Sequence, residues 1–423
     1  MIRTDVVAEA EARVRRDRLA ELCADMVDIA SPPGEERALA EHLAAVAADA
    51  GLDGAVQEVE GDLCNAHGRL PGRAGGPGLL LYAPIDTVTV GAAADDLPWA
   101  GPELRPDMQP RAEVRDGAVF GLGAQNPKGH GACVLAAVEA IAATGVTLER
   151  DLLVGFGGGG MPTTARRPDL PDAHGRGCAA LVAELGPDEA VIAKTGWAVS
   201  WTEVGLTWFE VEVRGSHTYV GSRHLLPYRN AIADAAHLVA GLERWFERWA
   251  DDTGDDLIAP QGVVAAIEGG WPHMPAFTTA LCRFHVDLRL HPRTTSSEAA
   301  AAFGAELERL AAEIGADASC QQTVAIPGTS TDPDAPIIRS AIEAWESVDG
   351  DVHRPIPRLS GATDANILRS AGVPTARIGL PKISRPGLDV DFALGMNAVD
   401  LGDMERLTSA LIRIALGRCG VAG

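Results

Sequence analysis

An apolar segment that ends in a carboxylate is the feature of this sequence best suited to chemistry. It reads LLLYAPIDTVTVG over residues 79–91, so that Asp86 follows three leucines and a corner of small residues. Such a run predicts a buried parallel strand, and open α/β sheets bind ligands at the carboxyl ends of their strands. We therefore expect Asp86 to lie in the functional site.

Titratable side chains gather in a second segment, RGSHTYVGSRHLLPYRN at 214–230. His217 and His224 are candidate general acids or bases, because the unperturbed pKa of imidazole lies close to neutral. Tyr219 lies between them and is also a catalytic candidate. An alternative interpretation is structural, with His217 and Tyr219 capping a sheet edge or lining a dimer contact.

Further polar residues are candidates for the same site. Lys194 can stabilise a developing oxyanion or bind a carboxylate, which makes it the fifth catalytic candidate. The glycines at 157–160 either present backbone N–H groups to an anion or simply allow close passage of the chain. The side chains expected to bind substrate are Asn126, Lys128, His130, Arg223, Arg289 and Lys382.

Composition limits the kinds of partner. The chain has 423 residues and a formal net charge of −23, which predicts two domains and argues against nucleic acid or an anionic membrane as a partner. No apolar run reaches the roughly 20 residues that span a bilayer. Its N-terminus mixes acids and bases and is not a secretory signal, and the seven cysteines are scattered without a CxxC pair. We therefore expect a reduced, cytoplasmic protein.

The order of predicted elements indicates an inserted domain. Helices predicted at 5–30 and 35–51, a strand at 56–63 and a loop at 92–115 belong to a first half in which strands and helices alternate. The fold class is thus α/β, a mostly parallel sheet flanked by helices. From about Trp197 the pattern becomes that of antiparallel strands with helices on one face. The expected domains are a discontinuous α/β domain and an inserted α+β domain, at 1–197 with 317–423 and at 198–316.

Several short motifs, in this order and at these spacings, resemble one enzyme family. They are GLGAQNPKGHGA at 121–132, Asp287-Leu288-Arg289, and SGATD at 360–364 followed by AGVPT at 371–375. The family is that of di-zinc aminoacylases, acetylornithine deacetylases, succinyl-diaminopimelate desuccinylases and carboxypeptidase G, metallopeptidase family 20. The resemblance implies a zinc-peptidase-like domain, an inserted lid domain that pairs two subunits into a homodimer, and a small amino-acid-like substrate.

The family's zinc ligands are replaced at the matching positions. The two histidines fall on Pro84 and near Ala393, and the bridging aspartate falls on Asn126. The paired glutamates, a general base and a ligand, fall on Gly160 and Met161, and the further carboxylate falls on Ala193 (or Lys194). The histidine that reaches the partner's active site falls on Tyr219, and only Asp86 is kept. Zinc needs three or four nitrogen, sulfur or carboxylate donors, so we expect no metal cofactor and no metal-binding residues.

The resulting hypothesis is a repurposed enzyme that acts at a C–N amide bond of a small amino-acid-derived substrate without metal. One alternative is a non-catalytic small-molecule binder or partner subunit. Another is ligation, elimination or cyclisation on a similar substrate, because the usual hydrolytic nucleophile is a metal-bound water. The enzyme hypothesis predicts that Lys194→Met and His217→Ala abolish turnover and leave the fold intact.

Overall fold

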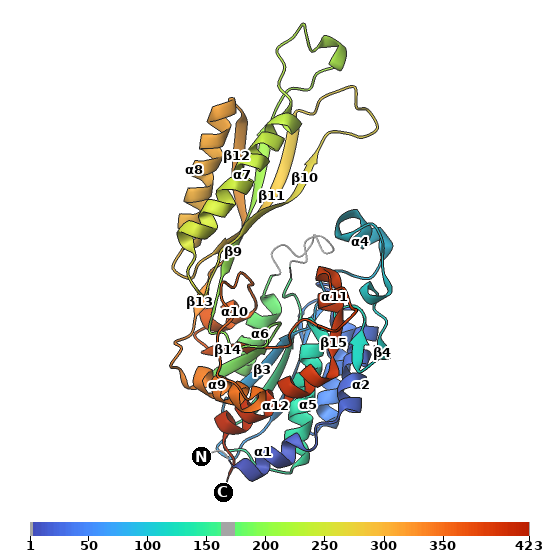
Figure 1. Cartoon of the computed structure of the whole chain (residues 1–423), viewed down its shortest axis with the longest axis vertical. Coiled ribbons are helices and arrows are strands. Elements are labelled where there is room, and N and C mark those ends of the chain that lie inside the picture. Colours follow the sequence, from blue (N-terminus) through green and yellow to red (C-terminus); the bar gives the residue numbers. More distant parts are fainter. Residues whose placement is uncertain (1–2, 162–173, 423) are drawn as a thin grey trace. The chain divides into compact units, whose positions relative to one another are not determined.

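The computed structural model describes residues 3–161 and 174–422. The chain divides into two compact units, which are described separately (Figure 1). The first unit comprises residues 1–201, 331–355 and 363–423, and the second comprises residues 202–330 and 356–362. The inserted segment therefore continues past the expected boundary at 316.

A six-stranded sheet forms the centre of the first unit, in the order β1-β2-β6-β3-β7-β14. Its strands are β1 (Ala55–Glu60), β2 (Leu63–Leu70), β3 (Leu79–Pro84), β6 (Leu152–Gly157), β7 (Glu189–Ala193) and β14 (Thr375–Ile378). The four strands from β6 to β14 run parallel, and β2 pairs antiparallel with both β1 and β6. The expected α/β class, a mostly parallel sheet flanked by helices, is confirmed.

The leucine run of β3 is explained by burial on both faces of the sheet. Successive side chains of a strand point to opposite faces. Leu79 and Leu81 accordingly join the hydrophobic core on one side, whereas Leu80 and Tyr82 join the core on the other. A strand covered on both faces needs apolar residues at every position, which is why β3 lacks polar alternation.

Helices cover both faces of this sheet. The larger core packs α1 (Thr4–Glu11), α2 (Arg16–Asp28), α3 (Arg37–Asp49), α5 (Lys128–Ala143), α9 (Pro336–Asp349) and α12 (Leu401–Cys419). The opposite core packs α6 (Arg176–Leu185) and α10 (Ala365–Ser370). Helices α4 (Ala93–Ala100) and α11 (Phe392–Asn397) and the small sheet of β4 (Glu113–Arg115), β5 (Ala118–Phe120) and β15 (Ala398–Asp400) complete the unit.

The second unit is an antiparallel sheet with two helices. Its strand order is β10-β11-β9-β12, from β9 (Gly205–Arg214), β10 (Gly262–Gly269), β11 (Leu281–Leu290) and β12 (Asp317–Ile326). Alternate residues of β9 and β11 are buried against α7 (Ala231–Thr253) and α8 (Ser296–Ile314). The other residues face away from these helices, as the period of two predicts. Two short strands, β8 (Thr202–Glu203) and β13 (Thr329–Ser330), pair antiparallel at the start and the end of the inserted segment.

Two predicted elements differ from the structure, and one strand was not predicted. The helix expected at 5–30 is two helices, α1 and α2, separated by a turn with an extended residue at Arg15. The loop expected at 92–115 contains α4, a 3₁₀ turn at Pro106–Met108 and β4. Strand β12 was not predicted because most of its residues are exposed and polar, and its pairing with β9 carries the second unit beyond residue 316.

Candidate functional site

Asp86 lies just beyond the carboxyl end of β3, the edge at which ligands are expected. Its side chain is buried, with only 4 % of the residue exposed, and Oδ2 accepts a hydrogen bond from the backbone N–H of Met161 at 2.7 Å. Met161 follows the glycine run that begins at the end of β6. Two neighbouring parallel strands thus bring Asp86 and the glycine run together.

A second buried carboxyl group, Glu36, lies at the start of α3. Its Oε1 accepts hydrogen bonds from the backbone N–H groups of Gly34 at 2.8 Å and Gly159 at 2.9 Å. Among the described residues, Oε2 is buried without a hydrogen-bond partner. Glu36 was not among the residues proposed from the sequence, although two acidic residues, Glu35 and Glu36, directly follow the proline- and glycine-containing segment at 31–34.

Asp364 is the third buried carboxyl group, and Tyr82 orients it. Asp364 precedes α10, and its Oδ2 accepts a hydrogen bond from the Tyr82 hydroxyl at 2.5 Å. Burial, and then the adjacent charge of Asp364, hold the pKa of Tyr82 well above its ordinary value. The hydroxyl therefore stays protonated and donates to the carboxylate.

The glycines at 157–160 permit this close packing. A Cβ on Gly160 would lie 3.0 Å from Oδ1 of Asp86 and 3.3 Å from Oδ2 of Asp364. A Cβ on Gly157 would lie 2.1 Å from the Tyr82 hydroxyl oxygen, a distance that no real contact allows. Of the two interpretations of this run, the structure supports close passage of the chain past buried side chains.

Burial and mutual repulsion raise the pKa values of two of these groups. The pKa of Glu36 is raised to about 8, mainly by burial and then by the charge of Asp86. The pKa of Asp86 is raised to about 6; burial dominates, Lys194 opposes it and Asp364 adds to it. Lys194 directly follows β7, and its positive charge lowers the pKa of Asp86. Near neutral pH, Glu36 is thus mostly protonated and Asp86 is mostly ionised.

The structure places Lys128 and His130 inside the first unit, and substrate contact by either residue stays a prediction. Both residues are fully buried at the start of α5. The Lys128 Nζ donates to the carbonyl oxygen of Ile29 at 2.7 Å, and burial lowers its pKa to about 7. The His130 Nε2 accepts from the backbone N–H of Leu380 at 3.0 Å, and burial lowers its pKa well below the ordinary value. Both side chains join separate chain segments inside the core.

Five other candidates belong to the second unit: His217, Tyr219, Arg223, His224 and Arg289. The His217 ring lies beside the ring of Phe277, and its Nδ1 is 2.8 Å from the carbonyl oxygen of Thr278. Tyr219 packs against the same phenylalanine, and Arg289 pairs with Asp287 at 2.8 Å. These contacts lie within the second unit, so a role with Asp86 stays a prediction.

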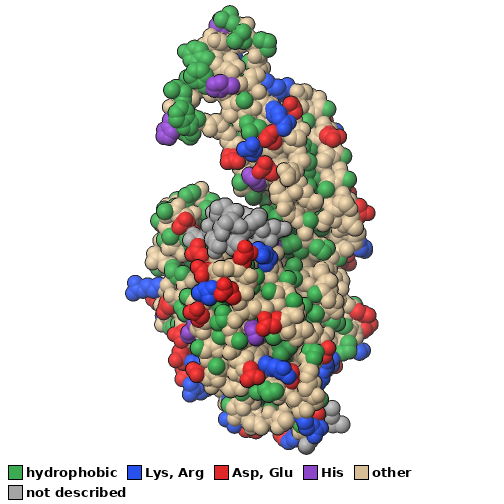
Figure 2. All heavy atoms as spheres, turned by 180° about the vertical axis from the view of Figure 1, so that it is seen from behind, with side chains coloured by type: hydrophobic (Ala, Val, Ile, Leu, Met, Phe, Trp, Pro, Cys, Tyr) green, Lys and Arg blue, Asp and Glu red, His purple; other side chains and the backbone are tan. Residues whose placement is uncertain are grey.

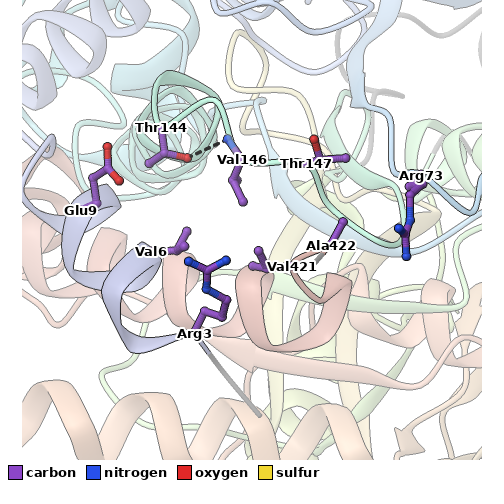
Figure 3. Close-up of a pocket in the computed structure, with 9 residues that line it drawn as sticks. All are labelled: Arg3, Val6, Glu9, Arg73, Thr144, Val146, Thr147, Val421 and Ala422. Carbon is purple, nitrogen blue, oxygen red and sulfur yellow. Dashed lines mark hydrogen bonds between the residues drawn. The ribbon is translucent and has the colours of Figure 1, made fainter.

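The remaining two candidates, Asn126 and Lys382, lie in the first unit. Asn126 lines a cavity of about 270 Å³ beside the carboxyl end of β3. The Nζ of Lys382 lies 5.5 Å from the centre of the Phe392 ring. A larger cavity of about 390 Å³ lies between the chain ends, at the segments that precede β3 and β6 (Figure 3). It is at the amino ends of these strands, away from the buried carboxyl groups.

The described residues offer few donors to a metal ion. Within residues 3–161 and 174–422, no group of three or more His, Cys, Asp or Glu side chains is placed to hold one. Asp86 and Asp364 do converge on Gly160. Two more aspartates, Asp169 and Asp172, lie outside the described residues.

Comparisons with known proteins identify the fold. The model of peptidase family M20/M25/M40 matches residues 80–415. Human carnosine dipeptidase 1 is similar over 98% of both chains, with a TM-score of 0.71 and 15% identity. A tripeptidase of Staphylococcus aureus is similar over 95% of this chain and 98% of its own, with a TM-score of 0.68 and 16% identity. The YXEP protein of Bacillus subtilis, a dinuclear metal-binding peptidase, is similar over 95% of this chain and 97% of its own, with a TM-score of 0.60 and 14% identity.

These comparisons correct the expectation that the protein has no metal cofactor. The matching family is one of peptidases, and a solved member with this fold is a dinuclear metal-binding enzyme. The expectation relied on individual positions such as Pro84 and Gly160, and it treated their substitution as loss of the cofactor itself.

None of the helices among the described residues has the length and apolarity needed to span a bilayer.

Proposed function

Because the chain belongs to peptidase family M20/M25/M40, we propose that it hydrolyses the C–N amide bond of a small amino-acid-derived substrate. One observation of this chain carries the proposal. Three buried carboxyl groups, those of Glu36, Asp86 and Asp364, gather around the glycine run at the carboxyl edge of the sheet. Burying charge is costly, so such a cluster at the carboxyl edge of the sheet favours a catalytic function.

Amide hydrolysis needs one group that accepts a proton from water and another that donates a proton to the leaving nitrogen. Asp86, with a pKa of about 6, is ionised near neutral pH and is suited to accept the proton. Glu36, with a pKa of about 8, is protonated there and is suited to donate one. In this proposal the hydrogen bond from Tyr82 holds the side chain of Asp364 in place beside Asp86.

The family also favours a divalent metal as cofactor of this reaction. Glu36 and Asp86 are assigned proton transfers only, because the carboxyl groups of the described residues do not form a three-donor metal site. The assay therefore has to include Zn²⁺, Mn²⁺ or Co²⁺ as a variable.

The test is turnover of N-acyl amino acids and dipeptides, followed by release of the free amine, with and without added divalent metal. We expect turnover by the wild type and a fall in kcat of about 10²–10⁴-fold in Asp86→Asn, the range typical of a lost acid or base. Asp53→Asn, at an exposed position of the same unit, serves as the control and should keep the full rate. Binding without turnover under every metal condition would contradict the proposal and favour a non-catalytic binder.

We also propose that two copies pair through the second unit. Apolar side chains crowd its end, where the segments 219–226 and 271–277 meet (Figure 2). The exposed members are Tyr219, Val220, Leu225, Leu226, Trp271, Met274 and Phe277. A continuous exposed apolar patch of this kind marks an interface in most soluble proteins, and a symmetric dimer is the commonest way to cover it.

A further inference from the structure

Three side chains from separate parts of the chain hold the backbone of the glycine run that ends β6. The N–H of Gly158 donates to Oδ1 of Asn65 at 2.9 Å. The N–H groups of residues 159 and 161 donate to the carboxylates of Glu36 and Asp86. Side chains therefore bind three of the four N–H groups between residues 158 and 161, and Asn65 is the acceptor that the proposed reaction does not use.

Asn65 lies in β2, is completely buried and makes two further hydrogen bonds. Its Nδ2 donates to the carbonyl oxygen of Gly177 at 2.9 Å and to Oε1 of Gln57 at 2.6 Å. A reversed amide would oppose its nitrogen to the Gly158 N–H and its oxygen to two other oxygens. The three partners therefore favour one orientation of the amide, with its oxygen toward the glycine run.

The surroundings of this hydrogen bond are closely packed. Gln57 in β1 is itself held by α6, because its Nε2 donates to the carbonyl oxygen of Ala180 at 3.0 Å. A Cβ on Gly177, in the first turn of α6, would lie 2.5 Å from Oδ1 of Asn65 and 2.0 Å from the carbonyl oxygen of Gly158. Strands β1 and β2 and helix α6 thus form one hydrogen-bonded frame around residue 158.

The position of Gly158 affects both carboxyl groups assigned to proton transfer. A Cβ on Gly158 would lie 2.9 Å from the carboxyl carbon of Glu36, so the backbone lies directly against that side chain. Residues 159 and 161 follow closely, since consecutive Cα atoms are only about 3.8 Å apart. Hydrogen bonds weaken steeply with distance and angle. A shift at residue 158 would therefore disturb the contacts that orient Glu36 and Asp86.

We propose that Asn65 is a positioning residue, which holds Gly158 and thereby keeps the glycine run against Glu36 and Asp86. The inference rests on the proposed function for the reaction that this arrangement serves. A misplacement of about 1 Å can reduce a rate about 100-fold. Loss of the Asn65 amide should therefore lower kcat about 10- to 100-fold and leave KM within about twofold, because it disturbs the alignment of acid and base rather than binding.

Amide hydrogen exchange tests the positioning without any turnover. Exchange of the segment 157–161 is measured by mass spectrometry on the wild type and on Asn65→Leu, which has a similar shape and no hydrogen-bonding group. We expect exchange to be about tenfold faster in the variant, the effect of one lost buried hydrogen bond. Thr375→Val is the matched control, because the fully buried Thr375 Oγ1 donates to the Val373 carbonyl oxygen at 2.8 Å at the amino end of β14. It should change neither the exchange of this segment nor kcat.

Two further variants keep the test decisive. Asn65→Ala leaves room for water and replaces Asn65→Leu if that protein does not fold. Asn65→Asp restores the acceptor oxygen, and burial favours its neutral form, which accepts from Gly158 and donates to Gly177. This variant should keep the slow exchange of the wild type.

The outcomes separate this inference from the proposed function. Faster exchange in Asn65→Leu or Asn65→Ala, restored in Asn65→Asp, supports the positioning even if the wild type cleaves no amide. Unchanged exchange in a folded Asn65→Leu or Asn65→Ala protein would overturn it. So would exchange in Asn65→Asp as fast as in Asn65→Leu, or an undiminished kcat in Asn65→Leu where the wild type is active.

Discussion

The pair of Glu36 and Asp86 shows how burial sets the proton content of single residues. Glu36 accepts hydrogen bonds from two backbone N–H groups, which favour its ionised form. Its pKa is nevertheless raised to about 8, because burial and the charge of Asp86 outweigh those hydrogen bonds. A carboxyl group that is protonated in the folded protein and ionised in the unfolded chain binds more protons when folded. The free energy of unfolding then decreases as the pH rises.

This sign gives a prediction for Glu36→Gln. Between about pH 5 and 7 the wild type should lose stability with increasing pH, by up to about 1.4 kcal/mol per pH unit for one proton. The variant should show a flatter dependence, because glutamine does not titrate. Denaturant unfolding at several pH values measures this, with Glu35→Gln, at an exposed neighbouring position, as the control. An unchanged slope in Glu36→Gln would show that Glu36 is ionised in the folded protein.

The prediction for Lys128 has the opposite sign. Burial lowers its pKa to about 7, so above pH 7 the unfolded chain binds the extra proton and stability should increase with pH. Lys128→Met should flatten this rise and should leave the KM of any amide substrate unchanged, since the side chain contacts the Ile29 carbonyl. A KM increased severalfold in a folded variant would instead support the predicted role of Lys128 in substrate binding.

At the residue scale, the position of Asp86 at the carboxyl end of a buried strand was predictable, because an aspartate after a leucine run is a local signal. Lys128 and His130 were substrate-binding candidates through the resemblance, and only the packing of α5 inside the core shows that both are fully buried. Glu36 and Tyr82 were overlooked because their partners, Gly159 and Asp364, lie more than a hundred residues away in the chain. Such pairings are not visible in local patterns.

At the scale of elements, the end of β6 is constrained by β3. Gly157→Ala would place its Cβ 2.1 Å from the hydroxyl of the fully buried Tyr82, so strands or ring must shift. We expect a loss of about 1–3 kcal/mol in the free energy of unfolding, as is typical of overpacking.

Gly304→Ala is the matched control for this substitution. Gly304 lies inside α8 with nothing within 4 Å of the added Cβ, so alanine should stabilise by about 0.5–1 kcal/mol. Thermal and denaturant unfolding measure both variants. Equal stability of Gly157→Ala and the wild type would mean that the end of β6 accommodates a methyl group beside Tyr82, which contradicts the packing described.

The helices and strands were predictable where one period dominated. The β3 run, and the alternation in β9 and β11, identify both sheets. Strand β12 was not predicted, because an exposed edge strand carries polar residues at most positions and lacks a regular apolar alternation. Helix α4 was not predicted because Pro98 and the surrounding prolines favour a loop. In the structure, the Asp96 carboxylate fixes the helix by accepting hydrogen bonds from the backbone N–H groups of residues 90 and 91.

At the scale of the whole molecule, the apolar end of the second unit predicts self-association. Leu225→Glu and Trp271→Glu place charges in the proposed interface, where both side chains are exposed. Sedimentation velocity should show a dimer for the wild type and monomer for the double variant. Val352→Glu, equally exposed on the first unit, should stay dimeric. A monomeric wild type at micromolar concentration would contradict the pairing.

The family and its fold were accessible from the order and spacing of motifs, but the cofactor was not. The substituted positions at 84, 126, 160 and 393 led to an expectation of no metal that the comparisons contradict. Individual ligand positions are a weak guide at identities near 15%, where the fold is retained and local alignments shift.

The most direct test of the account is the kcat of the wild type and of Asp86→Asn on a panel of N-acyl amino acids and dipeptides, with Zn²⁺, Mn²⁺ or Co²⁺ supplied. We expect release of free amine by the wild type and a rate about 10²–10⁴-fold lower for a folded Asp86→Asn protein. Amide hydrolysis at an undiminished rate in Asp86→Asn, or a wild type that cleaves no amide with any of these metals, would contradict it.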